Sequence, residues 1–289
     1  GRAGQVLAAS AKTAWTVNAE RTQAQGGDDQ SRLQLSDLKL GEGSRLQSLS
    51  GGKDWLLLPV QGTGPYPTIV WLDPPTPRSD QPPLAALLSN RSGGLNANLL
   101  TAQGYAVFFP QMDAHSEAAL RQVVQRLQGV TAVDSKRMAI LGRGWGANCA
   151  LLGASSKFPF QAVVAIEPRS DLGSHYAKLG LADKSPSEAL LGFHRRSASY
   201  ESSTSGLPWT DAPNYIKDSP YYQALQIEKP VLVFSGQDSS QAEQLFAALY
   251  RQRRPARLVS YPTRSNLLAD QVVHQWHQIH LWLARYLIS

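Results

Sequence analysis

Short apolar runs alternate with amphipathic segments along most of this chain, from residue 53 to its end. The apolar runs have the length and composition of buried strands, and the amphipathic segments repeat their apolar positions at helical spacing. The predicted strands are 55–60, 68–72, 106–109, 138–141, 162–166, 231–234 and 257–261. The predicted helices lie within 84–101, 116–128, 145–155, 241–253 and 271–287. This alternation predicts an α/β fold with a doubly wound, mostly parallel sheet.

Ser116 marks the start of one of these helices. A serine hydroxyl at this position can accept a hydrogen bond from a free amide of the first turn. The apolar residues that follow share one helical face and are Leu120, Val123, Val124 and Leu127. We therefore predict a helix that runs to Gln128 and packs with this face on the sheet.

Residues 1–52 follow a different pattern. Polar turns separate its short strand-like pieces, which are 6–9, 14–17 and 32–38. Three strands of this length cannot form a stable sheet alone. The predicted domains are therefore a short N-terminal β segment, 1–52, and an α/β domain, 53–289. Residues 170–219 are rich in Ser, Gly and Pro, and they are predicted to form an insertion with short helices over the carboxyl edge of the sheet.

A strand, a three-glycine turn and a helix of small residues follow one another at the centre of the chain. The turn reads Gly142-Arg143-Gly144-Trp145-Gly146. Glycine tolerates backbone conformations that side chains resist, which gives the alternating glycines a steric reason. The frame matches the nucleophile elbow G-x-S-x-G of α/β-hydrolases, with Gly144 in the place of the nucleophilic serine. Glycine has no hydroxyl and cannot form an acyl-enzyme, so a tight junction without chemistry is the simplest alternative.

The same turn satisfies the dinucleotide-binding pattern G-x-G-x-x-A through Gly142, Gly144 and Ala147. Glu167 ends the next predicted strand, where an acidic partner of a ribose is wanted. That pattern normally opens the first βαβ unit of its domain, whereas at least three predicted strands of this domain precede Gly142. A dinucleotide-binding protein that uses Gly142, Gly144 and Glu167 is therefore kept as a second alternative.

Four further segments, taken in order, carry a family resemblance. They are Tyr66-Pro67-Thr68-Ile69-Val70-Trp71-Leu72, Gly104-Tyr105-Ala106-Val107, Val133-Asp134-Ser135-Lys136-Arg137-Met138-Ala139-Ile140, and Ser219-Pro220-Tyr221 followed by Lys229-Pro230-Val231-Leu232-Val233-Phe234-Ser235-Gly236. Their order and spacing resemble the C-terminal catalytic domain of the prolyl oligopeptidase family, which includes the dipeptidyl and acylaminoacyl peptidases. The resemblance covers about residues 53–289 and implies an α/β-hydrolase fold. It also implies that residues 1–52 correspond to the last blade of a β-propeller and that this chain is the C-terminal part of a longer protein.

The resemblance places the catalytic triad of that family on residues that have lost its chemistry. The nucleophile falls at Gly144. The histidine normally follows a strand and a Tyr-Pro pair, and Asn266 stands in its place after Tyr261-Pro262. Asparagine cannot take up and return a proton, so general-base chemistry is lost as well. The acid corresponds to Asp238, although family members often space it one residue later, which would be Ser239.

The oxyanion hole is altered too. The loop that carries an HGG-like run in the family reads Asp73-Pro74-Pro75 here. Proline has no N–H to donate, so donors are missing where an oxyanion would need them. The backbone N–H of Trp145 is the donor that survives at this position.

These losses predict a catalytically inactive pseudohydrolase that binds a peptide, a small ligand or a protein partner. The first alternative is a serine-type peptidase or esterase that is still active through other residues, such as Ser92 or Ser235. The second is the dinucleotide-binding protein described above. The predicted pseudohydrolase needs no cofactor.

Composition limits the remaining classes of function. The net charge is +6, from 28 basic and 22 acidic residues, but no basic stripe is interleaved with aromatic residues, so no nucleic-acid partner is predicted. No apolar run is long enough to span a bilayer, and the single cysteine, Cys149, excludes an internal disulfide. His274, His277 and His280 recur on the last predicted helix without a fitting carboxylate, so no metal site is predicted. A homodimer through the last strand or helix stays open, and no compartment is predicted.

Overall fold

The computed structural model describes residues 5–9, 14–17, 23–26, 32–34, 44–50, 54–72, 83–87, 96–112, 116–178, 185–203, 206–236, 239–261 and 267–288. Their strands form one large and one small sheet. The large sheet has eight strands in the order β12-β11-β10-β9-β7-β8-β6-β5. These strands are β5 (Arg45–Leu49), β6 (Asp54–Leu58), β7 (Tyr66–Leu72), β8 (Ala106–Phe109), β9 (Val133–Arg143), β10 (Phe160–Ile166), β11 (Val231–Ser235) and β12 (Ala256–Ser260). Strand β6 pairs antiparallel with β5 and β8, and all other pairs are parallel.

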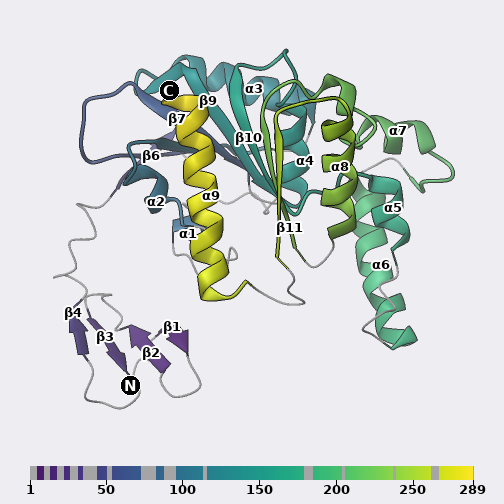
Figure 1. Ribbon diagram of the computed structural model, residues 1–289, viewed down its shortest axis with the longest axis horizontal. Helices are drawn as coiled ribbons and strands as arrows, with labels where there is room; N and C mark the ends of the chain where they lie inside the picture. Colours follow the sequence, from purple (N-terminus) through teal and green to yellow (C-terminus); the bar gives the residue numbers. More distant parts are fainter. Residues whose placement is uncertain are drawn as a thin grey trace.

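Helices cover both faces of this sheet (Figure 1). One core cluster packs on α3 (Glu117–Gln128), α4 (Trp145–Leu152) and α8 (Ser239–Arg251). The other packs on α1 (Leu84–Leu87), α2 (Asn98–Thr101) and α9 (Ala269–Leu287). The predicted doubly wound, mostly parallel α/β fold is confirmed, and the strand order is that of an α/β-hydrolase.

The sheet has a topological switch point between β7 and β9, which are neighbours. The chain leaves β9 into α4 on one face, whereas it leaves β7 toward α1 and α2 on the opposite face. Ligands of open α/β sheets bind in the crevice that such a divergence opens at the carboxyl ends of the strands. The glycine turn lies at this point.

Helix α3 begins as its sequence predicts. The Ser116 hydroxyl accepts a hydrogen bond from the Ala119 amide at 3.2 Å. Its predicted apolar face is buried in the first core cluster. Near the other end of α3, Arg126 forms an ion pair with buried Asp54 of β6 at 2.8 Å, which ties the helix to the sheet.

The N-terminal segment contains the small antiparallel sheet, with the strand order β1-β2-β3-β4. Its strands are β1 (Gln5–Ala9), β2 (Ala14–Val17), β3 (Gln23–Gly26) and β4 (Arg32–Gln34). Strand β3 was not predicted, because Gln-Ala-Gln-Gly has no apolar alternation. Strand β5 precedes the predicted domain boundary at residue 53, yet it pairs with β6 in the large sheet.

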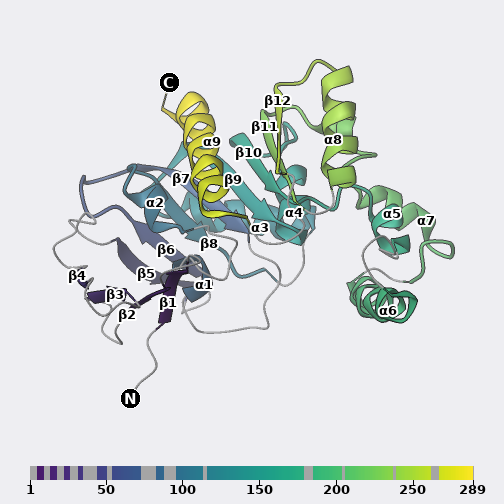
Figure 2. The ribbon, with the colours of Figure 1, turned by 60° about the horizontal axis from the view of Figure 1, so that its bottom comes forward.

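The predicted insertion forms α5 (Leu172–Ala177), α6 (Pro186–Ser203) and α7 (Ala212–Lys217). These helices lie together beyond α8, at one end of the molecule (Figures 1 and 2). The expectation of only short helices is wrong for α6, which has 18 residues. A short 3-10 helix, η3 (Ala224–Gln226), then leads back to the sheet. Among the described helices, none has the length and apolar character that a membrane crossing requires.

Candidate functional site

The glycine turn joins β9 to α4 with the backbone of a nucleophile elbow. Gly144 precedes α4 with φ 55° and ψ −116°, a conformation that costs an L-residue free energy. Its amide donates a hydrogen bond to the carbonyl oxygen of Ile166 in β10 at 2.9 Å. The turn is therefore held in the strained geometry that presents a nucleophile above the sheet.

The three glycines of the turn differ in what surrounds them. A Cβ on Gly142 would overlap the carbonyl oxygen of Gly146, and a Cβ on Gly146 would overlap that of Leu72. A Cβ on Gly144 would meet no atom of the described residues within 4 Å. Close packing thus requires glycine at the outer positions, whereas the central position has open space where a serine side chain would stand.

An arginine stacks on Trp145, the residue that follows Gly144 in the turn. The Arg169 guanidinium stacks over the Trp145 ring, 4.9 Å from its centroid. Asn148 of α4 fixes the backbone at Arg169, since its amide donates to the Arg169 carbonyl at 2.7 Å and accepts from the Arg169 N–H at 2.8 Å. The segment after β10 is therefore anchored to the helix that starts at the turn.

The neighbouring strand ends are joined by an ion pair. Arg143 contacts the Glu167 carboxylate at 3.2 Å. Glu167 has a positive φ of 51°, and its amide donates to the Phe234 carbonyl at 2.8 Å. Its carboxylate also packs against Gly236, where a Cβ would collide with it. The acidic residue of the dinucleotide alternative is thus paired with Arg143.

Three of the predicted site residues, Asp73, Asp238 and Asn266, lie outside the described residues. The last described residues before them are Leu72, Gly236 and Tyr261. Leu72 ends β7, Gly236 follows β11 and Tyr261 follows β12. All three strands run parallel to β9. These three described residues therefore lie at the same edge of the sheet as Gly144.

Other side chains that could act as nucleophile, base or metal ligand are hydrogen-bonded or buried in the structure. Ser235, an alternative nucleophile, is 2% exposed and donates to the Ser260 hydroxyl at 2.8 Å. His274 contacts the Tyr261 hydroxyl through Nδ1 at 2.9 Å. Cys149 is buried as predicted, and burial raises its thiol pKa to about 12. Across the described ranges, no three His, Cys, Asp or Glu residues gather closely enough to hold a metal ion.

Sequence reasoning missed the side-chain contacts around the turn. The Arg143–Glu167 and Asn148–Arg169 contacts join residues 24 and 21 positions apart. Parallel pairing places Ile166 opposite Arg143, which brings the two strand ends together. An arginine inside the elbow, followed by a glutamate after the next strand, was the signal available in the sequence.

No family model matches the sequence, and neither does any curated protein sequence. Solved structures of peptidases do match the fold. Acylaminoacyl peptidase from Pyrococcus horikoshii has a TM-score of 0.63 at 13% identity, over 98% of this chain and 49% of its own. Dipeptidyl peptidase 4 from Porphyromonas gingivalis has a TM-score of 0.61 at 16% identity, over 95% and 42%. A puromycin-hydrolyzing peptidase from Mycobacterium tuberculosis has a TM-score of 0.62 at 16% identity, over 95% and 46%.

This chain therefore spans less than half the length of each of these proteins. Their likeness covers 95–98% of this chain. The expected resemblance is confirmed: the chain has the α/β-hydrolase fold found in peptidases of the prolyl oligopeptidase family.

Proposed function

We propose that this protein is a catalytically inactive relative of those peptidases, a pseudohydrolase, and that it binds a peptide, a small ligand or a protein partner in the former catalytic crevice. The observation that carries the proposal is Gly144. Its backbone has the elbow geometry and the space above it is open, but no hydroxyl is present to attack a carbonyl.

The sequence supports the loss of catalysis at two further positions. Asn266 occupies the place of the general base, and asparagine does not exchange protons at neutral pH. Pro74 and Pro75 occupy the oxyanion loop and have no amide hydrogen to donate. Since these positions belong to separate segments, one substitution cannot restore the chemistry.

The crevice retains features suited to binding. It lies at the switch point of the sheet, where ligands of such folds gather. Trp145 packs against a small apolar cluster, and Arg169, stacked on its ring, is a cation with no carboxylate within 4.0 Å among the described residues. Peptides and small organic ligands are recognised by such a mixture of apolar surface and a few charged groups.

The first test is intact-mass analysis after exposure to a fluorophosphonate probe, with an ester-hydrolysis assay in parallel. We expect an unmodified mass and no turnover, whereas an active serine hydrolase treated in the same way gains one adduct. A stoichiometric adduct on this protein would refute the proposal, and peptide mapping would identify the nucleophile.

The second test measures binding by thermal shift, because a ligand of the native state raises the unfolding midpoint by mass action. The screen includes peptides, and NAD(P) to examine the dinucleotide alternative. A crevice ligand should lose affinity in Arg169→Gln and keep it in Arg137→Gln, a control on the surface pair with Asp134. Equal affinity in both variants would place the ligand elsewhere.

A further inference from the structure

A second cavity lies away from the glycine turn. Its volume is about 560 Å³, within the range of small-molecule sites. The first turn of α3, the end of α4 and the segment from α7 to η3 form its walls. Helix α4 begins at Trp145 beside the former catalytic crevice and contributes Leu151 and Leu152 to this cavity. The two ends of α4 therefore face different sites, since its first residue lies beside the crevice and its last two residues line this cavity.

Positive charge predominates around the cavity. Its basic residues are Arg121, Lys157 and Lys217, and its acidic residues are Glu117 and Asp218. Glu117 is shared between Arg121 at 2.5 Å and Lys157 at 3.6 Å. Lys217 has no carboxylate within 4.0 Å in the part of the chain that the structure describes. Asp218 also lines the cavity and interacts electrostatically with Lys217, so the five charged side chains leave a net charge of +1, which favours an anion.

Hydrogen-bond donors line the same space. Helix α3 has 12 residues, and the amides of Glu117 and Ala118 in its first turn bond to no described residue. Amides at a helix N-terminus favour an anion, and the helix dipole adds to the attraction. Ser155 also lines the cavity, is only 9% exposed, and its hydroxyl bonds to no described residue. The Ser155 hydroxyl can therefore donate a hydrogen bond to a bound anion.

Apolar side chains complete the walls. They are Leu151, Leu152, Pro220 and Ile227. We propose that this cavity binds a small organic anion, an apolar body that carries one carboxylate or phosphate group. The anionic group lies between the start of α3, Ser155 and Lys217, and the apolar body lies against α4 and η3. The site is independent of the proposed function of the crevice.

Fluorescence titration of the full chain with 8-anilinonaphthalene-1-sulfonate tests the proposal, because this probe joins an apolar body to one anionic group. N-phenyl-1-naphthylamine has the same body without the charge. We expect saturable binding of the first probe at one site and much weaker binding of the second. Equal affinity for both would overturn the anion assignment. Competition by 4-phenylbutyrate or by phenyl phosphate then distinguishes a carboxylate from a phosphate preference.

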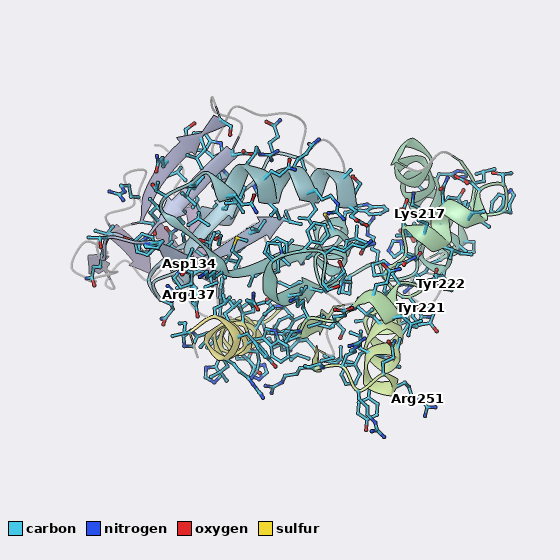
Figure 3. All side chains as sticks on the ribbon, turned by 90° about the horizontal axis from the view of Figure 1, so that it is seen from above. Asp134, Arg137, Lys217, Tyr221, Tyr222 and Arg251 are labelled. Atoms are coloured by element: carbon cyan, nitrogen blue, oxygen red, sulfur yellow. The ribbon has the colours of Figure 1, made fainter. Side chains whose placement is uncertain are left out.

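Two variants locate the bound probe. Ala118 is exposed at the rim, so Ala118→Phe should fill the cavity and weaken binding by about tenfold or more. Lys217→Gln should weaken binding by about two- to fivefold, as expected for one exposed charge. The controls are Ala102→Phe at the end of α2 and Lys136→Gln. Figure 3 shows Asp134 and Arg137, which flank Lys136 in sequence, at the end of the molecule away from Lys217. Unchanged affinity in Ala118→Phe, or an equal loss in the controls, would overturn the proposal.

Discussion

Arg143 donates from both Nε and Nη2 to one carboxylate oxygen of Glu167, at 3.2 Å in each case. The contact joins the ends of β9 and β10 directly beside Gly144. Both side chains are partly exposed, so the pair contributes less than about 1 kcal/mol to stability. Its larger effect is on charge, because it neutralises the cation within the elbow and leaves Arg169 as a nearby cation without a carboxylate within 4.0 Å among the described residues.

Restoring the nucleophile alone should not restore activity. We expect Gly144→Ser to fold, because its Cβ meets no atom of the described chain within 4 Å, and to lose about 1–3 kcal/mol of stability to the positive φ. Without a base at position 266, the new serine should remain unlabelled by a fluorophosphonate. The double variant Gly144→Ser/Asn266→His should show labelling by intact mass. Rapid labelling of the single variant would contradict the assigned role of Asn266.

The outer glycines of the turn should be intolerant of any side chain. Gly142→Ala drives a Cβ into the Gly146 carbonyl, and we expect a loss of about 3 kcal/mol or more in urea unfolding. Gly129→Ala is the matched control, because a Cβ there meets no atom within 4 Å and its φ is −88°. Similar stabilities for the two variants would show that the close packing at the turn is wrong.

The ion pair that ties α3 to β6 should matter for stability. Asp54 is 1% exposed, accepts from the Gln111 amide at 2.9 Å and pairs with Arg126. Asp54→Asn should cost about 3 kcal/mol in urea unfolding, since it leaves a buried network without its charge.

The control for this change is Asp134→Asn at the surface pair with Arg137, which should cost less than about 1 kcal/mol. The hydrogen bond from Arg137 lowers the pKa of Asp134. The small contribution of this pair is therefore present above the unfolded pKa of about 4 and is lost as the pH falls below it. Equal losses in Asp54→Asn and Asp134→Asn would contradict the described tie between α3 and β6.

The hydroxyl group of buried Tyr105 should be dispensable for stability. Tyr105 is fully buried, and its hydroxyl finds no hydrogen-bond partner among the described residues. Tyr105→Phe should therefore leave the free energy of unfolding unchanged or raise it by about 1 kcal/mol. Tyr261→Phe is the contrasting variant, because it removes the contact with His274 and should be destabilising.

Alkaline titration gives a second measurement on these tyrosines. Burial raises the pKa of both Tyr105 and Tyr261 to about 12. Since the folded values lie above the unfolded value of about 10, these two ionisations do not affect stability below pH 10, and they lower the free energy of unfolding as the pH rises from 10 toward 12. In absorbance titrations at 295 nm, Tyr105→Phe and Tyr261→Phe should each show one fewer tyrosine that ionises near pH 12. A normal titration of all ten tyrosines would contradict the burial of these two.

The parts of the fold that were predicted correctly are those with strong local signals. The apolar run 106–109 is β8, and Ser116 begins α3 as expected. Helix α6 was missed because its serine-rich sequence has a weak amphipathic pattern, although Pro186 suits the first helical position. Local pattern specifies an element well where one face is clearly apolar, and less well where distant contacts stabilise it.

The candidate site also has one part that could be predicted from local sequence and one part that could not. The elbow at Gly144 could be predicted because glycine spacing reflects backbone geometry, which is a local property. The contacts of Glu167 and Arg169 could not, because they depend on strand register and on how the segment after β10 returns to α4. The positions of Asp73, Asp238 and Asn266 stay predictions from the sequence.

The outer glycines of the turn have a consequence for how such proteins are recognised. Gly142 and Gly146 are required by the contact of α4 with its own turn and with Leu72, whether or not a reaction takes place above them. Random mutagenesis of this turn should therefore eliminate almost every substitution at the two outer positions, whereas substitutions at Gly144 meet only the strain of its backbone conformation. A glycine-spaced elbow is thus a signature of how a helix meets a strand, and it would persist in a lineage that had abandoned hydrolysis.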